Sequence, residues 1–326
     1  MRIAIDYTSA IAQSAGIGRY TRGLVAALLR EVADERLILY SSDAPRPGRA
    51  FPRDAHVSAR VAGIGTHAIG NRWMTILWHR AHLPLPIELL TGPVDVFHAP
   101  DFSLAPSLGA RRIVTIHDLA YLIHPECALP RLVAYLNGVV ERAVRGAEAI
   151  VAVSARTAGD LVARLGVARE RIAVIPLGVE AIFAPVRDRA QLAALDARYH
   201  LEHPLTLAVG TIEPRKNYAR LIEAFARARQ APGGPRMLAF AGGDGWLSAD
   251  VYAAVARTGL EHHVRFLGYV PDADLPALYS TADLLAMPSI YEGFGIPVLE
   301  AMACGTPVLC SDGGSLPEVA GDAALI

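Results

Sequence analysis

The stretch from Tyr291 to Glu300 reads Y-E-G-F-G-I-P-V-L-E and has the residue types and spacing best suited to chemistry. An apolar run precedes it, and Pro297 suits the first turn of a helix because its φ angle is fixed near the helical value. The N-terminal amides and the dipole of such a helix favour phosphate or sugar oxygens. Glu292 and Glu300 stand eight positions apart across this bend, so their carboxylates could bind two hydroxyl-bearing parts of one ligand. The plainer alternative is that Glu300 only favours a helix N-terminus and that Glu292 is solvated.

Two basic residues, Arg215 and Lys216, form a second candidate site. They follow the apolar run Leu205–Gly210 and open a predicted helix, so two cations meet a helix N-terminus, and both features favour an anion. Lys216 is the single lysine among the 31 basic residues, which hints that arginine does not serve at this position; chance is the alternative. A solvated charged turn is the structural alternative for the pair.

Polar residues also end apolar runs in the first half of the chain. His117 and Asp118 follow one such run, which places them at the carboxyl edge of a predicted sheet, where open α/β folds bind ligands. Asp118 could orient His117 or a substrate, and a histidine buried for structural reasons is the alternative. His98 is a weaker candidate at the same edge. Gly16 and Gly18 precede a predicted helix, where their amides could approach a diphosphate or an acceptor molecule.

These N-terminal glycines fit a dinucleotide-binding fingerprint poorly. Gly16 comes ten positions after the run that ends at Asp6, whereas the fingerprint turns directly from strand to helix. A third glycine is misplaced, because Gly23 follows Gly18 by five positions. Asp43 after the second apolar run keeps an NAD-dependent oxidoreductase open as the weakest alternative.

Short apolar runs alternate with amphipathic segments along the whole chain. Many runs are continuous over four to six residues, which is typical of strands buried on both faces of a parallel sheet. Strand and helix in repeated alternation predict an α/β protein with right-handed crossovers. The predicted strands are Arg2–Asp6, Leu37–Tyr40, His56–Val61, Val94–His98, Ile113–His117, Ala149–Val153, Ile172–Pro176, Leu205–Gly210, Met237–Ala241, Val264–Leu267, Leu284–Met287 and Pro307–Cys310. The clearest predicted helices are Arg19–Leu29, Arg131–Arg145 and Tyr218–Gln230.

The alternation breaks between Gly178 and His203, where a strand is followed by Pro185 and a polar stretch. We interpret this segment as the connector between two Rossmann-like domains, 1–190 and 191–326, because 326 residues exceed what one core usually fills. Ligands tend to bind where two such domains face each other, so we expect a site in a cleft between them.

The end of the chain carries a short helix signal and then stops. Ser315 and Glu318 have the spacing of a capping box at the start of a helix. The chain ends at Ile326, whereas a second α/β domain of five strands would normally continue into further helices. We therefore expect a truncated C-terminal domain.

Composition and charge exclude several classes of protein. Apolar residues make up 52% and charged residues 19%, which provides ample material for buried cores. The net charge of −1 gives no basic field for nucleic acid. Cys127, Cys304 and Cys310 are too few for a disulfide framework and form no C-x-x-C zinc pair, so we read them as reduced thiols of a cytosolic protein.

The sequence predicts no membrane-spanning segment, but one predicted helix could contact a membrane surface. The chain opens without a signal peptide, and no window reaches the roughly 18 to 20 apolar residues of a spanning helix. The segment 72–80 mixes Arg72 and Arg80 with Trp73 and Trp78 on a predicted helix. Such a helix could lie in lipid headgroups, although we favour one that packs its Trp and Leu side chains inward.

Taken in order, the motifs resemble one enzyme family. G-I-G-R-Y-T, V-F-H-A-P, V-T-I-H-D-L, G-T-I-E-P-R-K-N, F-L-G-Y-V-P, E-G-F-G-I-P-V-L-E-A-M-A-C-G-T-P-V and G-G-S-L-P-E-V follow one another along the chain. This order and spacing resemble the retaining glycosyltransferases of family four, the group 1 transferases, across essentially the whole chain. The resemblance implies an α/β architecture of two Rossmann-like domains, the GT-B fold.

The resemblance also implies a role for each matching residue. Glu300 would hold the donor ribose, Glu292 would lie beside the donor sugar, and Arg215 and Lys216 would meet the diphosphate. One departure is Thr211, where many members carry an arginine. The predicted donor-binding residues are Gly16, Gly18, Arg215, Lys216, Gly268, Tyr269, Val270, Glu292, Gly293, Phe294, Gly295 and Glu300, and the predicted catalytic residues are His117, Asp118 and Glu292.

The expected reaction transfers a hexose, with mannose from GDP-mannose as first choice, to a glycan or a lipid-linked acceptor. The resemblance implies retention at the anomeric carbon and no metal or other cofactor. We expect a cytoplasmic protein, with the inner face of the membrane as a contact left open. A nucleotide-sugar epimerase of similar fold and a non-catalytic nucleotide-sugar-binding module remain as alternatives, distinguished by whether donor plus acceptor yields a glycoside.

Overall fold

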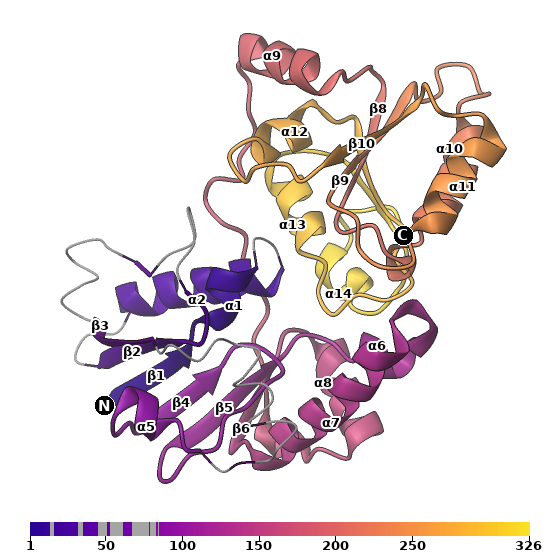
Figure 1. Ribbon diagram of the computed structural model, residues 1–326. Coiled ribbons are helices and arrows are strands. Elements are labelled where there is room, and N and C mark those ends of the chain that lie inside the picture. Colours follow the sequence, from indigo (N-terminus) through magenta and orange to yellow (C-terminus); the bar gives the residue numbers. More distant parts are fainter. Residues whose placement is uncertain are drawn as a thin grey trace. The chain divides into compact units, whose positions relative to one another are not determined.

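The computed structural model describes residues 1–13, 16–31, 35–44, 51–52, 61–66, 78, 83 and 85–326, with the backbone alone for 61–66. Contacts divide the chain into two units, each built on a parallel sheet (Figure 1). Unit 1 comprises Met1–Leu119 and Ala134–Ile175, and unit 2 comprises Ala120–Val133 and Pro176–Ile326. The domain division near residue 190 stays a prediction; α9 (Arg189–Tyr199) begins at that point in the chain.

The sheet of unit 1 has seven parallel strands in the order β3-β2-β1-β4-β5-β6-β7. The strands are β1 (Arg2–Asp6), β2 (Arg36–Ser41), β3 (Val61–Thr66), β4 (Val96–Ala99), β5 (Arg111–Ile116), β6 (Ala149–Ala152) and β7 (Ile172–Val174). The helices of this unit include α1 (Thr8–Ala12), α2 (Ile17–Glu31), α5 (Glu88–Thr91), most of α7 (Pro130–Gly146) and α8 (Ala155–Leu165), whereas α6 (Ala120–Ile123) and the start of α7 belong to unit 2. The strand order reverses between β1 and β4.

Unit 2 repeats this plan with five parallel strands in the order β10-β9-β8-β11-β12. The strands are β8 (Leu205–Val209), β9 (Met237–Ala241), β10 (Val264–Gly268), β11 (Leu284–Met287) and β12 (Val308–Cys310). The helices besides α6 and α9 include α10 (Tyr218–Ala228), α11 (Ala249–Thr258), α12 (Leu275–Thr281), α13 (Ile296–Ala303) and α14 (Leu316–Ala320). Here the order reverses between β8 and β11.

Continuous apolar strands fill two cores in unit 2, one on each face of the sheet. Along β9, Met237, Ala239 and Ala241 enter the core formed with α12 and α13. Leu238 and Phe240 enter the other core, formed with α10 and α11. Figure 1 shows these two pairs of helices on opposite sides of the sheet. Because successive side chains of a strand point to opposite faces, a strand covered on both faces must be apolar throughout.

Most predicted elements agree with the structure to within two residues at each end. The predicted strand His56–Val61 lies outside the described residues except for its last residue, Val61, where β3 begins. The capping box at Ser315 is wrong, because the Ser315 side chain makes no capping hydrogen bond at the start of α14. Its hydroxyl donates to the carbonyl oxygen of Glu292 instead, at 3.1 Å.

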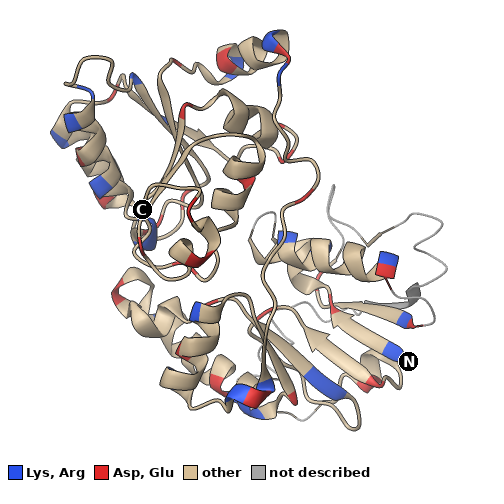
Figure 2. Ribbon diagram, turned by 180° about the vertical axis from the view of Figure 1, so that it is seen from behind, with Lys and Arg blue, Asp and Glu red and all other residues tan. Residues whose placement is uncertain are grey.

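The described part of the chain has neither a helix segment of a single charge sign that stands out in Figure 2 nor a helix suited to crossing a membrane. Figure 2 shows basic and acidic positions interspersed along the helices of both units, in keeping with a net charge of −1. No helix among the described residues is both long and apolar enough to cross a membrane. The predicted helix at 72–80 lies outside the described residues apart from Trp78, whose side chain is buried and donates to the carbonyl oxygen of Leu85 at 2.9 Å.

Candidate functional site

The reversal of strand order in unit 2 brings two loops together. β8 and β11 are neighbours in the sheet although two strands and three helices separate them in sequence, and their carboxyl ends lie at the same edge. Ligands bind at such a reversal in open α/β sheets, because the helices that follow the two strands leave on opposite faces. The loop after β8 carries Arg215 and Lys216, and the loop after β11 carries Glu292.

Four charged side chains meet where these loops approach each other. Lys216 Nζ donates to Glu292 Oε1 at 2.7 Å, and Arg215 Nη1 donates to Glu292 Oε2 at 2.7 Å. Arg215 Nη2 donates to Oε1 of a further acid, Glu213, at 2.6 Å. Glu213, Lys216 and Glu292 are each more than nine-tenths buried. Buried charges are tolerated only when they are paired in this way.

The two cations determine the ionisation of Glu292. Burial alone would raise the pKa of its carboxyl, but the Arg215 guanidinium and the Lys216 ammonium outweigh burial and lower that pKa to about 2. Glu292 is therefore an anion throughout the neutral range, with both oxygens accepting hydrogen bonds from cations.

Gly210 at the end of β8 makes room for Lys216. Its φ of +141° favours glycine, and a Cβ there would lie 3.1 Å from Lys216 Cε and 3.3 Å from Lys216 Nζ. A side chain at this position would press on the lysine where it turns toward Glu292. The glycine that ends the strand is thus part of the arrangement that places the ammonium group.

The segment before α14 contacts the backbone of the loop that carries Glu292. The amide of Ser315 donates to the Glu292 carbonyl oxygen at 3.0 Å, alongside the Ser315 hydroxyl. Gly314, with φ +70°, packs so closely that a Cβ would lie 2.2 Å from the same oxygen. The motif G-G-S-L-P-E-V does not reveal this role in the sequence, because the contact is to a residue distant along the chain.

Glu300 lies within α13, in its second turn. It is 1% exposed, and its Oε2 accepts a hydrogen bond from the hydroxyl of Tyr279 on α12 at 2.7 Å. Because the burial of a charge is costly, the plainer alternative that Glu300 only favours a helix N-terminus does not explain a carboxylate at this buried position. Tyr279 was not singled out from the sequence, and its apolar surroundings gave no signal.

The segment Gly293–Gly295 leads into α13 as predicted. Gly295 has φ +95° and precedes the helix, and a Cβ on it would lie 2.6 Å from Leu316 Cδ2. Phe294 is buried. The first amides of α13 and the helix dipole therefore lie at the loop that carries Glu292, where they favour an anion.

The predicted donor-binding residues Gly268, Tyr269 and Val270 lie at the end of β10, at the same edge of the sheet. Gly268 has φ +66° and its carbonyl oxygen accepts from the Gly242 amide at 2.8 Å. Tyr269 is exposed, whereas Val270 is buried in the core of unit 2. The side chain of Val270 is therefore not available to a ligand.

Unit 1 has its own cluster of polar residues at the reversal between β1 and β4. Asp6 ends β1, and burial raises the pKa of its carboxyl to about 6 although hydrogen bonds from Thr8 oppose the change. His98 in β4 lies 2.9 Å, Nε2 to Oγ1, from Thr115 in β5, and burial lowers its pKa to about 4. Asp101 follows β4, and burial raises the pKa of its carboxyl as well.

His117 follows β5 and has a defined tautomer. Its Nε2 lies 2.8 Å from the carbonyl oxygen of Pro100, which can only accept, so Nε2 carries the proton. Burial lowers the pKa of His117 although the Pro100 carbonyl, Asp101 and Asp118 favour the charged form. In the neutral ring Nδ1 is an acceptor, which suits it to bind a hydroxyl group.

Gly16 and Gly18 occupy different positions from each other. Gly16 has φ +57° and precedes α2, and its carbonyl oxygen accepts from the Tyr20 amide at 3.0 Å. Gly18 lies inside α2, where a Cβ would lie 2.2 Å from the carbonyl oxygen of Gln13. Gly18 thus permits close packing against the end of α1. Their predicted contact with the donor stays a prediction, and these residues, His117 and Asp118 are in unit 1, whereas all other predicted site residues are in unit 2.

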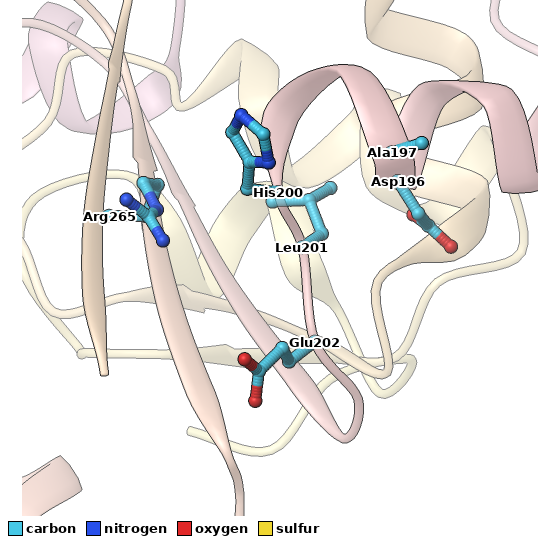
Figure 3. Close-up of a pocket in the computed structure, with 6 residues that line it drawn as sticks. All are labelled: Asp196, Ala197, His200, Leu201, Glu202 and Arg265. Atoms are coloured by element: carbon cyan, nitrogen blue, oxygen red, sulfur yellow. The ribbon is translucent and has the colours of Figure 1, made fainter. Parts of the chain in front are cut away.

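One hollow in unit 2 lies away from these loops. Figure 3 shows Arg265 from β10 near residues of α9 and the segment that leads into β8. The lining residues are Asp196, Ala197, His200, Leu201, Glu202 and Arg265. Because Glu202 precedes β8 and Arg265 is near the start of β10, the hollow is at the amino ends of the strands. It is open and of mixed charge, and it does not include any predicted site residue.

The acidic, histidine and cysteine side chains of the described residues bear on metal binding. There, no group of three or more His, Cys, Asp or Glu side chains is arranged to hold a metal ion. The Asp-x-Asp sequence at Asp272–Asp274 lies before α12, and Asp274 Oδ2 accepts from Tyr199 at 2.8 Å and from Arg198 at 2.9 Å. Independence from metal stays a prediction.

Solved structures with the same architecture define the class of fold. Sucrose-phosphate synthase from Thermosynechococcus elongatus is similar over 100% of this chain and 85% of that chain, with a TM-score of 0.71 and 20% identity. HepE from Anabaena, solved in complex with UDP and glucose, is similar over 98% and 82%, with a TM-score of 0.69 and 20% identity. The chain has the GT-B fold of two Rossmann-like domains, which confirms the predicted fold class.

Sequence comparisons identify the family. The family described as Glycosyltransferase Family 4 matches residues 14–181, and the one described as Glycosyl transferases group 1 matches residues 198–325. The chain belongs to the family-four, group 1 glycosyltransferases, as the motifs predicted.

Two relatives illustrate how far the similarity extends. O-antigen chain mannosyltransferase B from Escherichia coli is 36% identical over 71% of this chain and 60% of its own length. The 2-deoxystreptamine glucosyltransferase from Streptomyces kanamyceticus is 33% identical over 72% of this chain and 58% of its own length. The matched region thus spans somewhat more than half of each relative.

Proposed function

We propose that this chain is a retaining hexosyltransferase that moves a sugar, with mannose as first choice, from a nucleoside-diphosphate sugar to a glycan or lipid-linked acceptor. The products are a glycoside and the nucleoside diphosphate. The observation that carries the proposal is the cluster of Arg215, Lys216 and Glu292 at the strand-order reversal of unit 2, beside the N-terminus of α13.

The cluster suits the charge changes of glycosyl transfer. As the bond to the leaving group breaks, negative charge develops on the diphosphate and positive charge on the sugar. Cations and helix N-terminal amides that are already in place stabilise the former without reorganisation. Glu292, an anion at neutral pH, is suited to lie beside the latter. No enzyme carboxylate need act as a nucleophile, since in the proposed same-face displacement the leaving phosphate accepts the acceptor proton.

The remaining predicted residues complete the proposal. Glu300 would accept hydrogen bonds from the ribose hydroxyls, and the backbone from Gly268 to Val270 would lie beside the nucleobase. The Nδ1 acceptor of His117 would bind a hydroxyl of the donor sugar, with Asp118 close to the acceptor. Support for mannose comes from the relatives named as mannosyltransferases, and support for GDP follows from that choice.

A thermal-shift panel of GDP-mannose, UDP-glucose and an ADP-sugar tests the proposal. A donor at 100 times its dissociation constant should stabilise the full chain by about 2.7 kcal/mol. Glu300→Ala and the isosteric Glu300→Gln, which keeps an acceptor for Tyr279, should both abolish this shift. Glu223→Ala, which removes one side of an exposed ion pair on α10, should leave it unchanged. If every nucleotide leaves the melting temperature of the wild-type chain unchanged, the proposed function is wrong.

A further inference from the structure

The guanidinium of Arg215 is bound by protein groups on two sides. Nη2 donates to Glu213 Oε1 at 2.6 Å, while Nη1 donates to Glu292 Oε2 at 2.7 Å and to the Tyr291 carbonyl oxygen at 2.9 Å. The backbone adds a fourth link, because the Ile290 amide donates to the Arg215 carbonyl oxygen at 2.8 Å. Arg215 therefore fastens the loop after β11 to the segment after β8.

The side chain of Lys216 contacts Glu292, whereas that of Arg215 contacts Glu213, Tyr291 and Glu292. Its ammonium group has three donors, and one of them binds Glu292 Oε1 at 2.7 Å. An ammonium group can rotate its donors toward a new acceptor and keep Glu292, whereas the planar guanidinium of Arg215 is oriented by acceptors on both sides. Turning Arg215 toward a ligand would take this cation away from the buried carboxylate of Glu213 and would leave Glu292 with Lys216 as its cationic partner.

Resting on the proposed function, we propose that Arg215 and Glu213 are positioning residues and that Lys216 is the cation that meets the diphosphate. Glu213 orients Arg215, and Arg215 holds Glu292 and the Tyr291 carbonyl in the place where they serve the donor sugar. This assignment departs from the expectation that Arg215 and Lys216 both meet the diphosphate.

The two interpretations differ in what Glu213→Gln should do to the binding of the donor sugar relative to the nucleoside diphosphate. If Arg215 were a direct phosphate ligand, Glu213→Gln would remove a competing negative charge and strengthen the binding of a nucleoside diphosphate. If Arg215 positions Glu292, the same change weakens the hold on the sugar and leaves diphosphate binding unchanged or slightly tighter. Glu213→Gln keeps the size of the side chain and an oxygen acceptor for Arg215, so it is the variant that best preserves the fold.

Titration calorimetry on the full chain separates these outcomes, with GDP, UDP, GDP-mannose and UDP-glucose as the ligands. The quantity of interest is the dissociation constant of the nucleotide sugar divided by that of its nucleoside diphosphate. We expect Arg215→Gln and Glu213→Gln to raise this ratio by about tenfold, and Lys216→Gln to weaken the nucleoside diphosphate itself by about tenfold. The double variant Glu213→Gln/Arg215→Gln should be no worse than Arg215→Gln, because both act through Glu292. Arg257→Gln, which breaks an exposed ion pair with Glu223, is the matched control and should change neither quantity.

The proposal is overturned if Arg215→Gln weakens the nucleoside diphosphate as much as Lys216→Gln does, or if Glu213→Gln leaves the ratio at the wild-type value. Should Arg215→Gln fail to fold, Glu213→Gln and Lys216→Gln decide the question alone. If the wild-type chain binds none of the four ligands, the proposed function itself is wrong. A wild-type chain that binds them while the variants deviate from these expectations contradicts only the roles of Arg215 and Glu213.

Discussion

Lys216 and Glu292 show how strongly a buried site can restrict the choice of residue. The ammonium of Lys216 reaches Glu292 Oε1 beside Gly210, where an added Cβ would lie only 3.1 Å from Lys216 Cε. Arg215 binds the other oxygen of the same carboxylate. A second guanidinium in place of Lys216 would be larger and would need to fit against Gly210, which accounts for a lysine in a chain whose other basic residues are all arginine.

The lowered pKa of Glu292 predicts a particular loss of stability in acid. Because its folded-state pKa is about 2, against an ordinary value of 4.5, Glu292 contributes stability that is fully present above pH 4.5 and is lost as the pH falls toward 2. The shift corresponds to roughly 3 kcal/mol. Urea unfolding of the wild type and of Glu292→Gln between pH 6 and pH 2 should show a difference in unfolding free energy that shrinks across this range. A difference that stays constant would mean that the cations do not control this carboxyl.

At the scale of elements, the loop after β11 depends on the segment that precedes α14. Gly314 has φ +70°, and a Cβ there would lie 2.2 Å from the Glu292 carbonyl oxygen, which is backbone and cannot move aside cheaply. The same carbonyl accepts from the amide of Ser315. Displacement of this segment would therefore displace Glu292.

Gly314→Ala should both destabilise the chain and weaken the nucleotide shift. Strain at positive φ costs about 1 kcal/mol and overpacking a further 1 to 3 kcal/mol. Gly259→Ala is the control, since Gly259 has φ +64° at the end of α11 but nothing within 4 Å of an added Cβ. Gly259→Ala should therefore lose only the roughly 1 kcal/mol of unfolding free energy that strain at positive φ costs. Equal unfolding free energies for the two variants, measured in urea, would show that the close approach to Glu292 is unimportant.

Strands and helices were largely predictable, because parallel strands buried on both faces leave continuous apolar runs in the sequence. β9, for example, sends alternate side chains into two cores, so every residue of Met237–Ala241 is apolar. The capping box was not predictable in this way: Ser315 has the residue type for a cap, but its hydroxyl binds Glu292, which is distant in sequence.

The candidate site was predictable in part. Glu292, Glu300, Arg215 and Lys216 were all marked by residue type and by their position after a strand. The pairing among them was not, because it depends on β8 and β11 being neighbours in the sheet. Glu213 and Tyr279 were missed, since their roles follow from a hydrogen bond to another side chain rather than from their own surroundings in sequence.

At the scale of the whole molecule, the same principle applies twice. Each unit has a parallel sheet whose strand order reverses once, and in each the charged and polar residues gather at the reversal: after β1, β4 and the neighbouring β5 in unit 1, and after β8 and β11 in unit 2. The cations Arg215 and Lys216 and the glycine-rich start of α13 are in unit 2. We therefore propose that unit 2 binds the nucleoside diphosphate, and we keep His117 as the proposed partner of the reacting sugar.

A crystal structure of the full chain with the nucleoside diphosphate that gives the largest thermal shift tests this assignment most directly. The account predicts phosphate oxygens within hydrogen-bonding distance of Lys216 Nζ and the first amides of α13, with the ribose hydroxyls at the Glu300 carboxylate. A nucleotide bound instead in unit 1, between Gly16 and Asp43 as in an NAD-dependent enzyme, would contradict it.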